Sequence, residues 1–471
     1  MARITQVRAT LKNGPNYLAT ALGFAVLVGL AFLPALHGGF VYDDKGQILY
    51  NPRITSWSYL PQYFVTDIHA NIPTVLVRYY RPIHLLWFRL LYAIVGTSSW
   101  LWHLSSVLLH LAVVFCVFLL FRRLTDDLKS AVLAASLFAI HPIHAEAVAW
   151  LSCSADLLLA IFLVLCVYCY VNRKGPVSVP SVIFAALAMF TKEPGIVAPA
   201  LIFTYEWIHS NWKNAAFRVV PYVPLSFLYI AARINALGGL TREVPPKMSI
   251  SSMMLTWPDV LMTYLKHLIW PVHLSPVYQS RQGTAFLPLL IFIALAALFV
   301  FLLRDAQANI RFGAAWVAIT LLPALALRHM TPEDFVHDRY LYVPSIGLAL
   351  IAAVWLGRVR WTATRIVAVT SLSVILCWGT RINVRVWRDD ISLFTRAVEV
   401  APENAAAQNN LAEALLKANR PADAYPLIQQ LIAHYPDYYL GYYNLGRYYQ
   451  EMGDQRSADR EFAAAARLYG R

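Results

Sequence analysis

Long apolar runs constrain this chain more than any other feature of its sequence. The chain has 471 residues, of which 59% are hydrophobic and only 14% are charged, whereas soluble globular domains carry about 25% charged residues. The apolar residues come in blocks of about 18 to 22, the length that a helix needs to cross the hydrocarbon core of a bilayer. The sequence therefore predicts an all-α polytopic membrane protein and excludes a soluble enzyme.

About eleven apolar runs are expected to cross the membrane as helices. The first follows a basic N-terminal segment and is longer than the apolar part of a signal peptide. We therefore expect it to remain as a span, although Ala31 and Ala35 would suit cleavage. The expected spans are residues 17–36, 99–121, 128–149, 154–171, 179–191, 196–209, 217–236, 286–303, 311–328, 340–357 and 362–380.

Basic residues collect in the connections that follow every second span. Loops rich in lysine and arginine stay on the cytoplasmic side of a membrane, so the pattern predicts a cytoplasmic N-terminus and an external C-terminus. It also accounts for the net charge of +13 without a nucleic-acid partner. The basic connections are residues 122–129, 172–174, 213–218, 304–311 and 358–360.

Two further apolar stretches are predicted to lie on the outer membrane surface. Residues 259–270 are too short to cross the bilayer, and residues 75–95 have the pattern of an interfacial amphipathic helix. Their basic side chains recur at helical spacing: Arg78, Arg81, His84 and Arg89. With both stretches outside, residues 37–98 form a long first external segment and residues 237–285 form a second one.

The C-terminal part repeats with a period of 34 residues, since Pro402 matches Pro436 and Ala424 matches Ala458. This is the period of the tetratricopeptide repeat, a helix–turn–helix unit. About two repeats are visible, with a partial one over residues 387–400. Because fewer than three repeats rarely stand alone, we expect them to lean on the membrane domain or on a partner. The predicted domains are residues 1–385 in the membrane and residues 386–471 outside, the latter a short α-solenoid.

An acidic pair follows the first span, in the sequence Phe40-Val41-Tyr42-Asp43-Asp44. Aspartate is common in turns, and a turn or cap is the simplest explanation for an arbitrary pair. At the outer membrane face, however, a carboxylate can be partly desolvated, and its pKa then rises toward values that suit a general base. We therefore take Asp43 or Asp44 as the candidate catalytic base, without choosing between them.

Three other groups of polar residues are expected at the outer ends of spans. His141 and His144 are expected on one helical face, near Glu146 and Asp156. Two histidines without a third ligand are weak support for a metal, and we expect none.

Lys192 is a candidate for contact with a lipid phosphate, with Glu193 orienting it. Arg339 and the neighbouring hydroxyls suit a phosphate at headgroup level, in the sequence His337-Asp338-Arg339-Tyr340-Leu341-Tyr342. Tyr80 and Arg81 offer a second clamp.

These motifs, in this order and followed by the repeats, resemble the transmembrane and tetratricopeptide-repeat-containing protein O-mannosyltransferases and their bacterial relatives. The resemblance covers nearly the whole chain. It implies a GT-C helical bundle whose first external loop carries the catalytic acid, a polyprenyl-phosphate-linked sugar donor, and an inverting transfer to a hydroxyl acceptor, often a protein serine or threonine. No cofactor is expected, although a carboxylate pair can hold a divalent cation.

On this interpretation Arg339, Lys192 and Arg81, with Tyr340 and Tyr80, bind the phosphate and lipid of the donor. The supporting or sugar-binding residues are His141, His144, Glu146, Glu193, Asp156, His337 and Asp338. The sugar is mannose or another hexose, and the protein acceptor docks on the repeats. The absence of any Asn-x-Ser/Thr acceptor sequence favours a bacterial inner membrane over the endoplasmic reticulum.

Two alternatives remain open at this stage. A lipid-linked oligosaccharide polymerase or ligase would depend on arginine and histidine in a late external loop, and residues 328–339 contain Arg328, His329, His337 and Arg339. A non-catalytic membrane scaffold would instead depend on the repeats, residues 401–471. A dispensable acidic pair would favour the first alternative, and loss of function only on deleting the repeats would favour the second.

Overall fold

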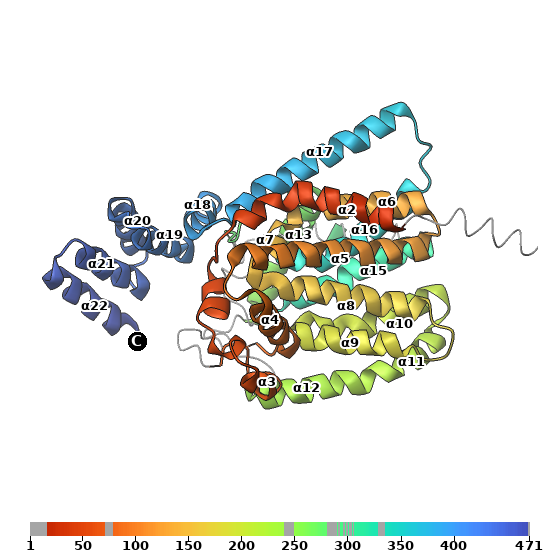
Figure 1. Cartoon of the computed structure of the whole chain (residues 1–471), viewed down its shortest axis with the longest axis horizontal. Helices are drawn as coiled ribbons and strands as arrows, with labels where there is room; N and C mark the ends of the chain where they lie inside the picture. Colours follow the sequence, from red (N-terminus) through yellow and green to blue (C-terminus); the bar gives the residue numbers. More distant parts are fainter. Residues whose placement is uncertain are drawn as a thin grey trace, which may run out of the picture.

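The computed structural model of the protein describes residues 17–70, 79–239, 249–279, 306–327 and 335–469, together with separate positions between 290 and 304. The described residues are helical or irregular and contain no strand, which confirms the all-α prediction. A bundle of long helices forms the body of the protein, and a smaller stack of helices projects from one end of it (Figure 1).

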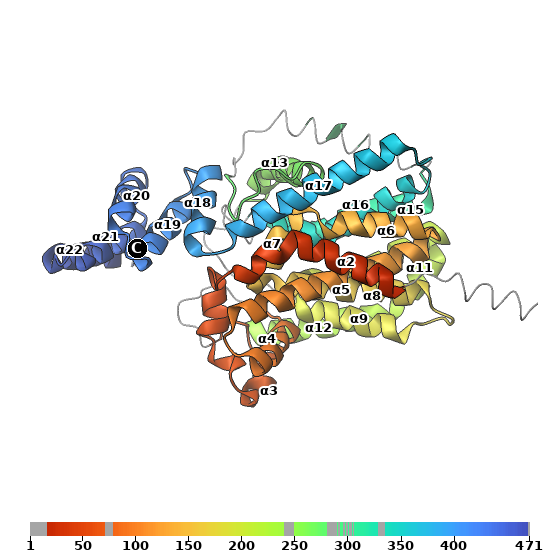
Figure 2. The same ribbon diagram turned by 45° about the horizontal axis from the view of Figure 1, so that its top comes forward.

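The bundle is built from helices that run side by side, joined by short connections at their ends (Figures 1 and 2). α5 contacts α2, α6 and α8, and α8 packs on α9. The bundle helices are α2 (Tyr17–Phe32), α5 (Ser99–Thr125), α6 (Leu128–Ala139), α8 (Ser154–Val171), α9 (Val179–Thr191), α10 (Ala198–His209), α12 (Val223–Leu237), α15 (Ala308–Leu321), α16 (Tyr342–Leu356) and α17 (Ala363–Val386).

Within the described residues, seven helical segments are long and apolar enough to span a membrane. Each corresponds to one of the expected runs, so a multi-pass membrane protein is confirmed. The segments are Tyr17–His37, Ser99–Thr125, Leu151–Val171, Trp212–Leu237, Ala308–Leu325, Asp338–Leu356 and Ala363–Val386.

The other four expected spans are bent, short or mostly outside the described residues. The run 128–149 is a pair of helices bent by 53° at the break between Ala139 and Pro142. The runs 179–191 and 196–209 form α9 and α10, which have 13 and 12 residues. At about 1.5 Å per residue these helices are shorter than the hydrocarbon core. The run 286–303 lies for the most part outside the described residues.

The basic connections gather at one end of the bundle, at the right in Figure 1. Hydrogen bonds join three of them: Arg123 Nε donates to Asn172 Oδ1 over 2.8 Å, and Asn309 Nδ2 donates to the carbonyl of Leu124 over 2.7 Å. The projecting helix stack and residues 37–63 lie at the opposite end. The basic connections therefore share one end of the bundle, as the charge pattern of the sequence predicted.

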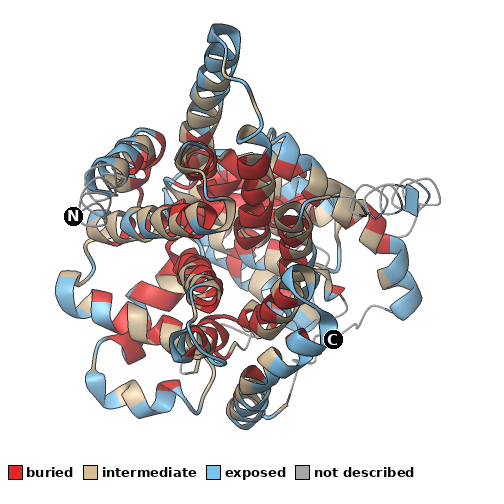
Figure 3. Ribbon diagram, turned by 90° about the vertical axis from the view of Figure 1, so that its right-hand side faces the viewer, coloured by how far each residue is buried: buried red, intermediate tan, exposed pale blue. Residues whose placement is uncertain are grey.

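The core of the bundle lies around α8, and its periphery includes α17. In the spanning windows, 78% of the segment Leu151–Val171 is buried, compared with 6% of the segment Ala363–Val386. In the end-on view, buried residues fill the centre, and the helix at the top, α17, is exposed along most of its length (Figure 3). Such an apolar exposed helix is suited to contact with lipid.

Residues 37–70 and 79–98 form a compact segment that contains two α-helices, α3 (Leu60–Tyr63) and α4 (Pro82–Val95). The polar face of α4 points inward: His84 Nε2 lies 3.0 Å from Ser154 Oγ, and Arg89 donates to the carbonyl of Ile54. The expected amphipathic helix therefore exists, but its basic side chains bind the protein and its apolar side chains Leu90 and Ile94 are exposed. Residues 71–78, with Arg78, lie outside the described residues.

The second expected interfacial helix is longer than predicted. α13 runs from Ile250 to Ile269 and contains Pro258, where the sequence predicted only residues 259–270. Its last turn carries His267, whose Nδ1 lies 3.1 Å from Asp338 Oδ1. The helix thus contacts the segment that opens α16.

A close helix crossing positions α16. A Cβ at Gly347 would lie 2.4 Å from the carbonyl oxygen of Gly313, and a Cβ at Gly313 would lie 2.8 Å from that of Gly347. The backbones of α15 and α16 therefore touch at these two residues, which explains a glycine as the sixth residue of the Tyr342–Leu356 helix.

The repeats form the projecting stack. α19 (Ala405–Lys417) and α20 (Pro421–His434) make one repeat, and α21 (Tyr439–Glu451) and α22 (Gln455–Tyr469) make the next. Asn419 and Gly453, which match at the 34-residue offset, both have left-handed φ angles, 56° and 79°. Ala424 and Ala458 are both fully buried where the paired helices touch. α18 (Asp390–Val400) joins this stack to α17.

Candidate active site

The predicted acidic pair is split between two environments. Asp44 is completely buried. Its Oδ1 accepts hydrogen bonds from the backbone N–H of Ser152 over 2.8 Å and from Ser152 Oγ over 2.6 Å, and its Oδ2 accepts the N–H of Val41 over 3.3 Å. Asp43, one residue earlier, is exposed. Asp44 therefore ties the loop to the start of α8, and Asp43 faces outward from it.

Burial determines how readily the carboxyl group of Asp44 loses its proton. Removal from water raises the pKa of its carboxyl to about 7, against the opposing effect of the hydrogen bonds from Ser152 and Val41, and the nearby Asp43 raises it further. At neutral pH both the ionised and the protonated forms are populated. This is the pKa range of a general base, but no acceptor can reach a carboxylate that is fully enclosed.

Glu146 and Arg339 form a buried ion pair. Arg339 Nη1 donates to Glu146 Oε1, its backbone N–H donates to Oε2 over 3.1 Å, and His337 Nδ1 lies 3.7 Å from Oε1. The Arg339 guanidinium also lies 4.9 Å from the ring centres of both Trp150 and Tyr340. The motif 141–150 and the motif 337–347 are thus brought together, as the sequence interpretation required.

Lys192 pairs with Asp156, not with Glu193. Lys192 Nζ lies 2.6 Å from each carboxylate oxygen of Asp156, and both side chains are buried. The ammonium also lies 5.9 Å from the ring centre of Tyr340, the ring that Arg339 contacts. Cys153 is close enough to Arg339, Asp156, Glu146 and Lys192 for all four to act on it electrostatically. Four predicted site residues therefore surround one turn.

Glu193 instead bridges two arginines. Arg81 donates to its Oε2 through Nε over 3.0 Å and Nη2 over 2.8 Å, and Arg233 donates to its Oε1 over 3.2 Å. Burial would raise the pKa of Glu193, but the two guanidinium groups lower it to about 2. Glu193 is therefore ionised, and the three residues together carry one net positive charge. Asp156 also acts electrostatically on Arg81, which places this cluster beside the Lys192 pair.

The two histidines of the motif 141–150 lie close together, with ring centres 5.8 Å apart, but they flank a 3₁₀ turn and do not lie on one long helix. His141 precedes a 3₁₀ turn and accepts from the N–H of Ile143, while His144 is fully buried with Nε2 2.9 Å from Ser345 Oγ. Pro142 starts the turn, because its fixed φ favours a helical start and breaks a preceding helix. The expected single helix is therefore wrong, and the pair does not form a metal-binding face.

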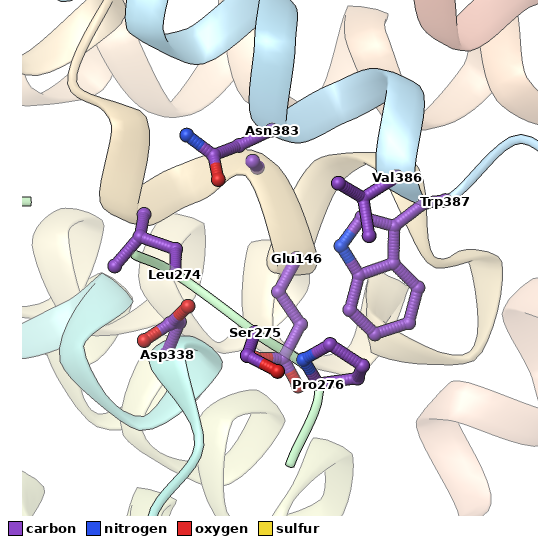
Figure 4. A pocket seen from close by; sticks show the side chains of 9 residues that line it. Glu146, Leu274, Ser275, Pro276, Asp338, Asn383, Val386 and Trp387 are labelled. Carbon is purple, nitrogen blue, oxygen red and sulfur yellow. The ribbon is translucent and has the colours of Figure 1, made fainter. Parts of the chain in front are cut away.

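Asp338 and Glu146 line a small pocket at this end of the bundle (Figure 4). Asp338 Oδ1 accepts from Tyr278 OH over 2.7 Å. The end of α17 closes one side of the pocket with Asn383, Val386 and Trp387, and residues 274–276 close another. The Trp387 ring stacks on Trp150 with ring centres 5.3 Å apart, so the pocket adjoins the aromatic group against which Arg339 rests.

The remaining site residues are Tyr80, which was predicted, and three residues that were not. Tyr80 is buried and its hydroxyl donates to the carbonyl of Phe64, so it supports the external segment. The sequence interpretation missed Ser152, Arg233 and Asp390. Ser152 carried no recognisable signal, and Asp390 lies in the stretch 387–394, which belongs to the family resemblance but was given no role. Arg233 could have been noted as a charge near the end of an apolar run.

The described part of the chain contains no group of three or more His, Cys, Asp or Glu side chains that could hold a metal ion. Independence from metal remains a prediction.

Comparison with known proteins identifies several that are similar to this chain. The tetratricopeptide repeat family matches residues 391–445. Protein O-mannosyl-transferase TMTC3 of Mus musculus is 26% identical over 505 aligned residues, which cover 94% of this chain and 54% of the mouse protein. TMTC1 of Homo sapiens is 26% identical over 91% of this chain and 57% of its own length.

The chain is thus similar to protein O-mannosyl-transferases over most of its length. Tmtc1 of Drosophila melanogaster is 33% identical, over a shorter region that covers 42% of this chain and 23% of the fly protein. The chain spans about half the length of the mouse and human O-mannosyl-transferases that it matches. Among solved structures, the Archaeoglobus fulgidus oligosaccharyltransferase tethered to an acceptor peptide aligns with a TM-score of 0.45 and 12% identity, over 88% of this chain and 59% of that protein.

The buried carboxyl of Asp44 makes the stability of the protein depend on pH. Its pKa is about 7 when folded and about 4 when unfolded, so between these values the folded state holds a proton that the unfolded state lacks. Stability contributed by this group is complete below about pH 4 and is lost as the pH rises toward 7. Asp44→Asn should flatten that decline, measured as melting temperature in lipid nanodiscs from pH 4 to 8. Parallel wild-type and variant curves would show that Asp44 does not titrate there.

Proposed function

We propose that the protein is an inverting glycosyltransferase of the GT-C type. It transfers mannose or another hexose from a polyprenyl-phosphate-linked donor to a hydroxyl acceptor, a protein serine or threonine, on the outer face of the membrane. The observation that carries the proposal is the exposed Asp43 held beside the buried Asp44, at the bundle end where Arg339, Lys192 and Arg81 gather. The homology to protein O-mannosyl-transferases supports it.

Asp43 is the base of the proposed reaction, and Asp44 is its positioning residue. Asp43 is exposed, so an acceptor can approach it, whereas the carboxylate oxygens of Asp44 are enclosed and already accept from Ser152 and Val41. In the reaction Asp43 takes the proton of the acceptor hydroxyl, while the hydroxyl oxygen of the acceptor attacks the anomeric carbon of the sugar. The bond from that carbon to the phosphate oxygen breaks, and the electron pair leaves with polyprenyl phosphate.

The leaving group explains the need for cations. A sugar linked to polyprenyl phosphate is a phosphodiester with one negative charge, and departure of the phosphate adds a second. Fixed positive groups stabilise such developing charge. The Arg339–Glu146 and Lys192–Asp156 pairs each join one cation to one carboxylate, while Glu193 lies between two cations, Arg81 and Arg233. We place the donor phosphate against the Arg81–Arg233 side, with Lys192 and Tyr340 between it and Arg339.

Other groups support this arrangement. Glu146 and Asp156 hold Arg339 and Lys192 in place. Asp338 lines the pocket, and His337, His141 and His144 support the site from the surrounding segments. Phosphate is a good leaving group, so the reaction needs neither a metal nor another cofactor. The protein acceptor docks on the repeats. The site faces the periplasm of a bacterial inner membrane, with the N-terminus in the cytoplasm, because the basic connections lie at the opposite end of the bundle.

Replacing Asp43 by asparagine should remove the base and leave donor binding intact. We expect a loss of about 100-fold or more in transfer, the usual contribution of a general base, with the donor dissociation constant unchanged. The measurement uses the purified full chain in nanodiscs, with polyprenyl-phosphate mannose as donor and a serine- and threonine-containing peptide as acceptor, with and without chelator.

Asp44→Asn is the matched comparison, since it removes an adjacent carboxylate of the same size. It should lower transfer less than Asp43→Asn and change thermal stability more. Full transfer by both variants would overturn the proposal and turn attention to the arginine and histidine residues of 328–339. An inactive wild type whose biological role is lost only on deleting residues 401–471 would favour a scaffold.

Arg233 gives a test of the phosphate site. Arg233→Met should weaken donor binding by about 10-fold or more, because a hydrogen bond to a charged group contributes about 1.5–3 kcal/mol. The control is Arg173→Met, which removes an arginine paired with Glu206 Oε2 over 2.7 Å near the basic connections. Equal donor affinities for the two variants, measured by quenching of intrinsic tryptophan fluorescence, would refute phosphate binding at Arg233.

A further inference from the structure

The loop that carries the acidic pair is fixed from two sides. On one side Asp44 accepts from Ser152 at the start of α8. On the other side the loop meets the junction between α17 and α18. Gly39 N–H donates to the carbonyl of Arg388 over 2.9 Å, and Tyr42 N–H donates to Asp390 Oδ1 over 2.9 Å. Lys45 Nζ forms an ion pair with the other oxygen, Asp390 Oδ2.

Asp390 is not the residue that caps its own helix, α18. The preceding residue, Asp389, caps α18 by accepting the N–H of Ser392 over 2.8 Å. This leaves both oxygens of Asp390 to the loop, one for Tyr42 and one for Lys45. Two adjacent aspartates at the start of α18 thus have separate tasks, the first local and the second between segments almost 350 positions apart.

The contact holds a backbone conformation that tyrosine seldom adopts. Tyr42 has a φ of 48°, in the left-handed region that disfavours residues with a Cβ. Its ring packs between Trp150 and Phe394, with ring centres 5.7 and 5.6 Å away. A strained residue persists only where its surroundings fix it, and here α18 supplies both a hydrogen-bond acceptor and an aromatic neighbour.

Asp43 lies between these two anchors. Tyr42 before it is held by Asp390, and Asp44 after it is held by Ser152. Because a catalytic carboxylate must be held to within about half an ångström of its working position, losing either anchor would let Asp43 move. The Asp390 anchor belongs to the helix that begins the repeat stack, and the Ser152 anchor belongs to the membrane bundle.

We propose that Asp390 is a positioning residue for Asp43, so that the first helix of the repeat stack is part of the active site. This inference rests on the proposed function for its effect on catalysis, but the loop contact itself is independent of that function. Asp390 touches no substrate. It acts by holding Tyr42 and Lys45, and therefore the turn that presents Asp43.

The test compares Asp390→Ala, Asp390→Asn, Lys45→Met and the control Asp389→Ala in the full chain in nanodiscs. Asp390→Ala removes both contacts. Asp390→Asn keeps an oxygen that can accept from Tyr42 N–H but loses the charge that pairs with Lys45, and Lys45→Met loses only that pair. Asp389→Ala removes the cap of α18 and leaves the loop contacts in place.

The first readout is amide hydrogen exchange in peptides covering residues 39–49. We expect Asp390→Ala to speed exchange there by about 10-fold, as expected for the loss of a hydrogen bond to a charged acceptor. Asp390→Asn and Lys45→Met should have smaller effects, and Asp389→Ala should speed exchange only within α18. Equal loop exchange in Asp390→Ala and Asp389→Ala would overturn the proposal.

The second readout is transfer from polyprenyl-phosphate mannose to the serine- and threonine-containing peptide. Asp390→Ala should lower kcat by about 10-fold or more at an unchanged KM for the donor, with partial recovery in Asp390→Asn. Asp389→Ala should keep the wild-type kcat. A kcat unchanged in Asp390→Ala refutes the positioning role. Absence of transfer by the wild type together with the predicted exchange pattern refutes the proposed function and leaves the loop contact established.

Discussion

The buried carboxylate of Asp44 is the interaction on which the rest of the site depends. Three hydrogen-bond donors converge on it, two from Ser152 and one from Val41, and those of Ser152 join the loop to the turn just before α8. A buried carboxyl is costly unless it is hydrogen bonded, so the loop has one favourable way to lie. Its neighbour Asp43 is exposed as a consequence. From the repeat side, Asp390 completes the arrangement by holding Tyr42 and Lys45.

The cations of the site are arranged in pairs with carboxylates instead of standing alone. A lone buried charge would be strongly unfavourable, whereas a hydrogen-bonded pair is tolerated. Arg339 and Lys192 are paired one to one and share the Tyr340 ring. Glu193 bridges Arg81 and Arg233. These contacts hold the cations at one end of the bundle, where we propose that the anionic donor binds.

The sequence predicted the helical class, the repeats and the gathering of the basic connections at one end, because hydropathy, charge and the 34-residue period are local signals. It did not predict the partners. Lys192 pairs with Asp156 and not with Glu193, and the polar face of α4 points inward through His84 and Arg89. Pro142 also breaks the helix expected around His141. Partners such as Ser152, Arg233 and Asp390 depend on long-range packing, which no periodicity in the sequence records.

The most direct test of the account is whether azide restores donor cleavage to Asp43→Ala. Azide is a nucleophile that carries no proton, so it needs no base. Its attack on the anomeric carbon would break the bond to phosphate and give mannosyl azide and polyprenyl phosphate. The account predicts that Asp43→Ala transfers almost no sugar to the hydroxyl acceptor, yet forms mannosyl azide of inverted anomeric configuration, identified by nuclear magnetic resonance. Formation of the azide with retained configuration, or no azide product from a variant that still binds donor, would contradict a single displacement assisted by Asp43.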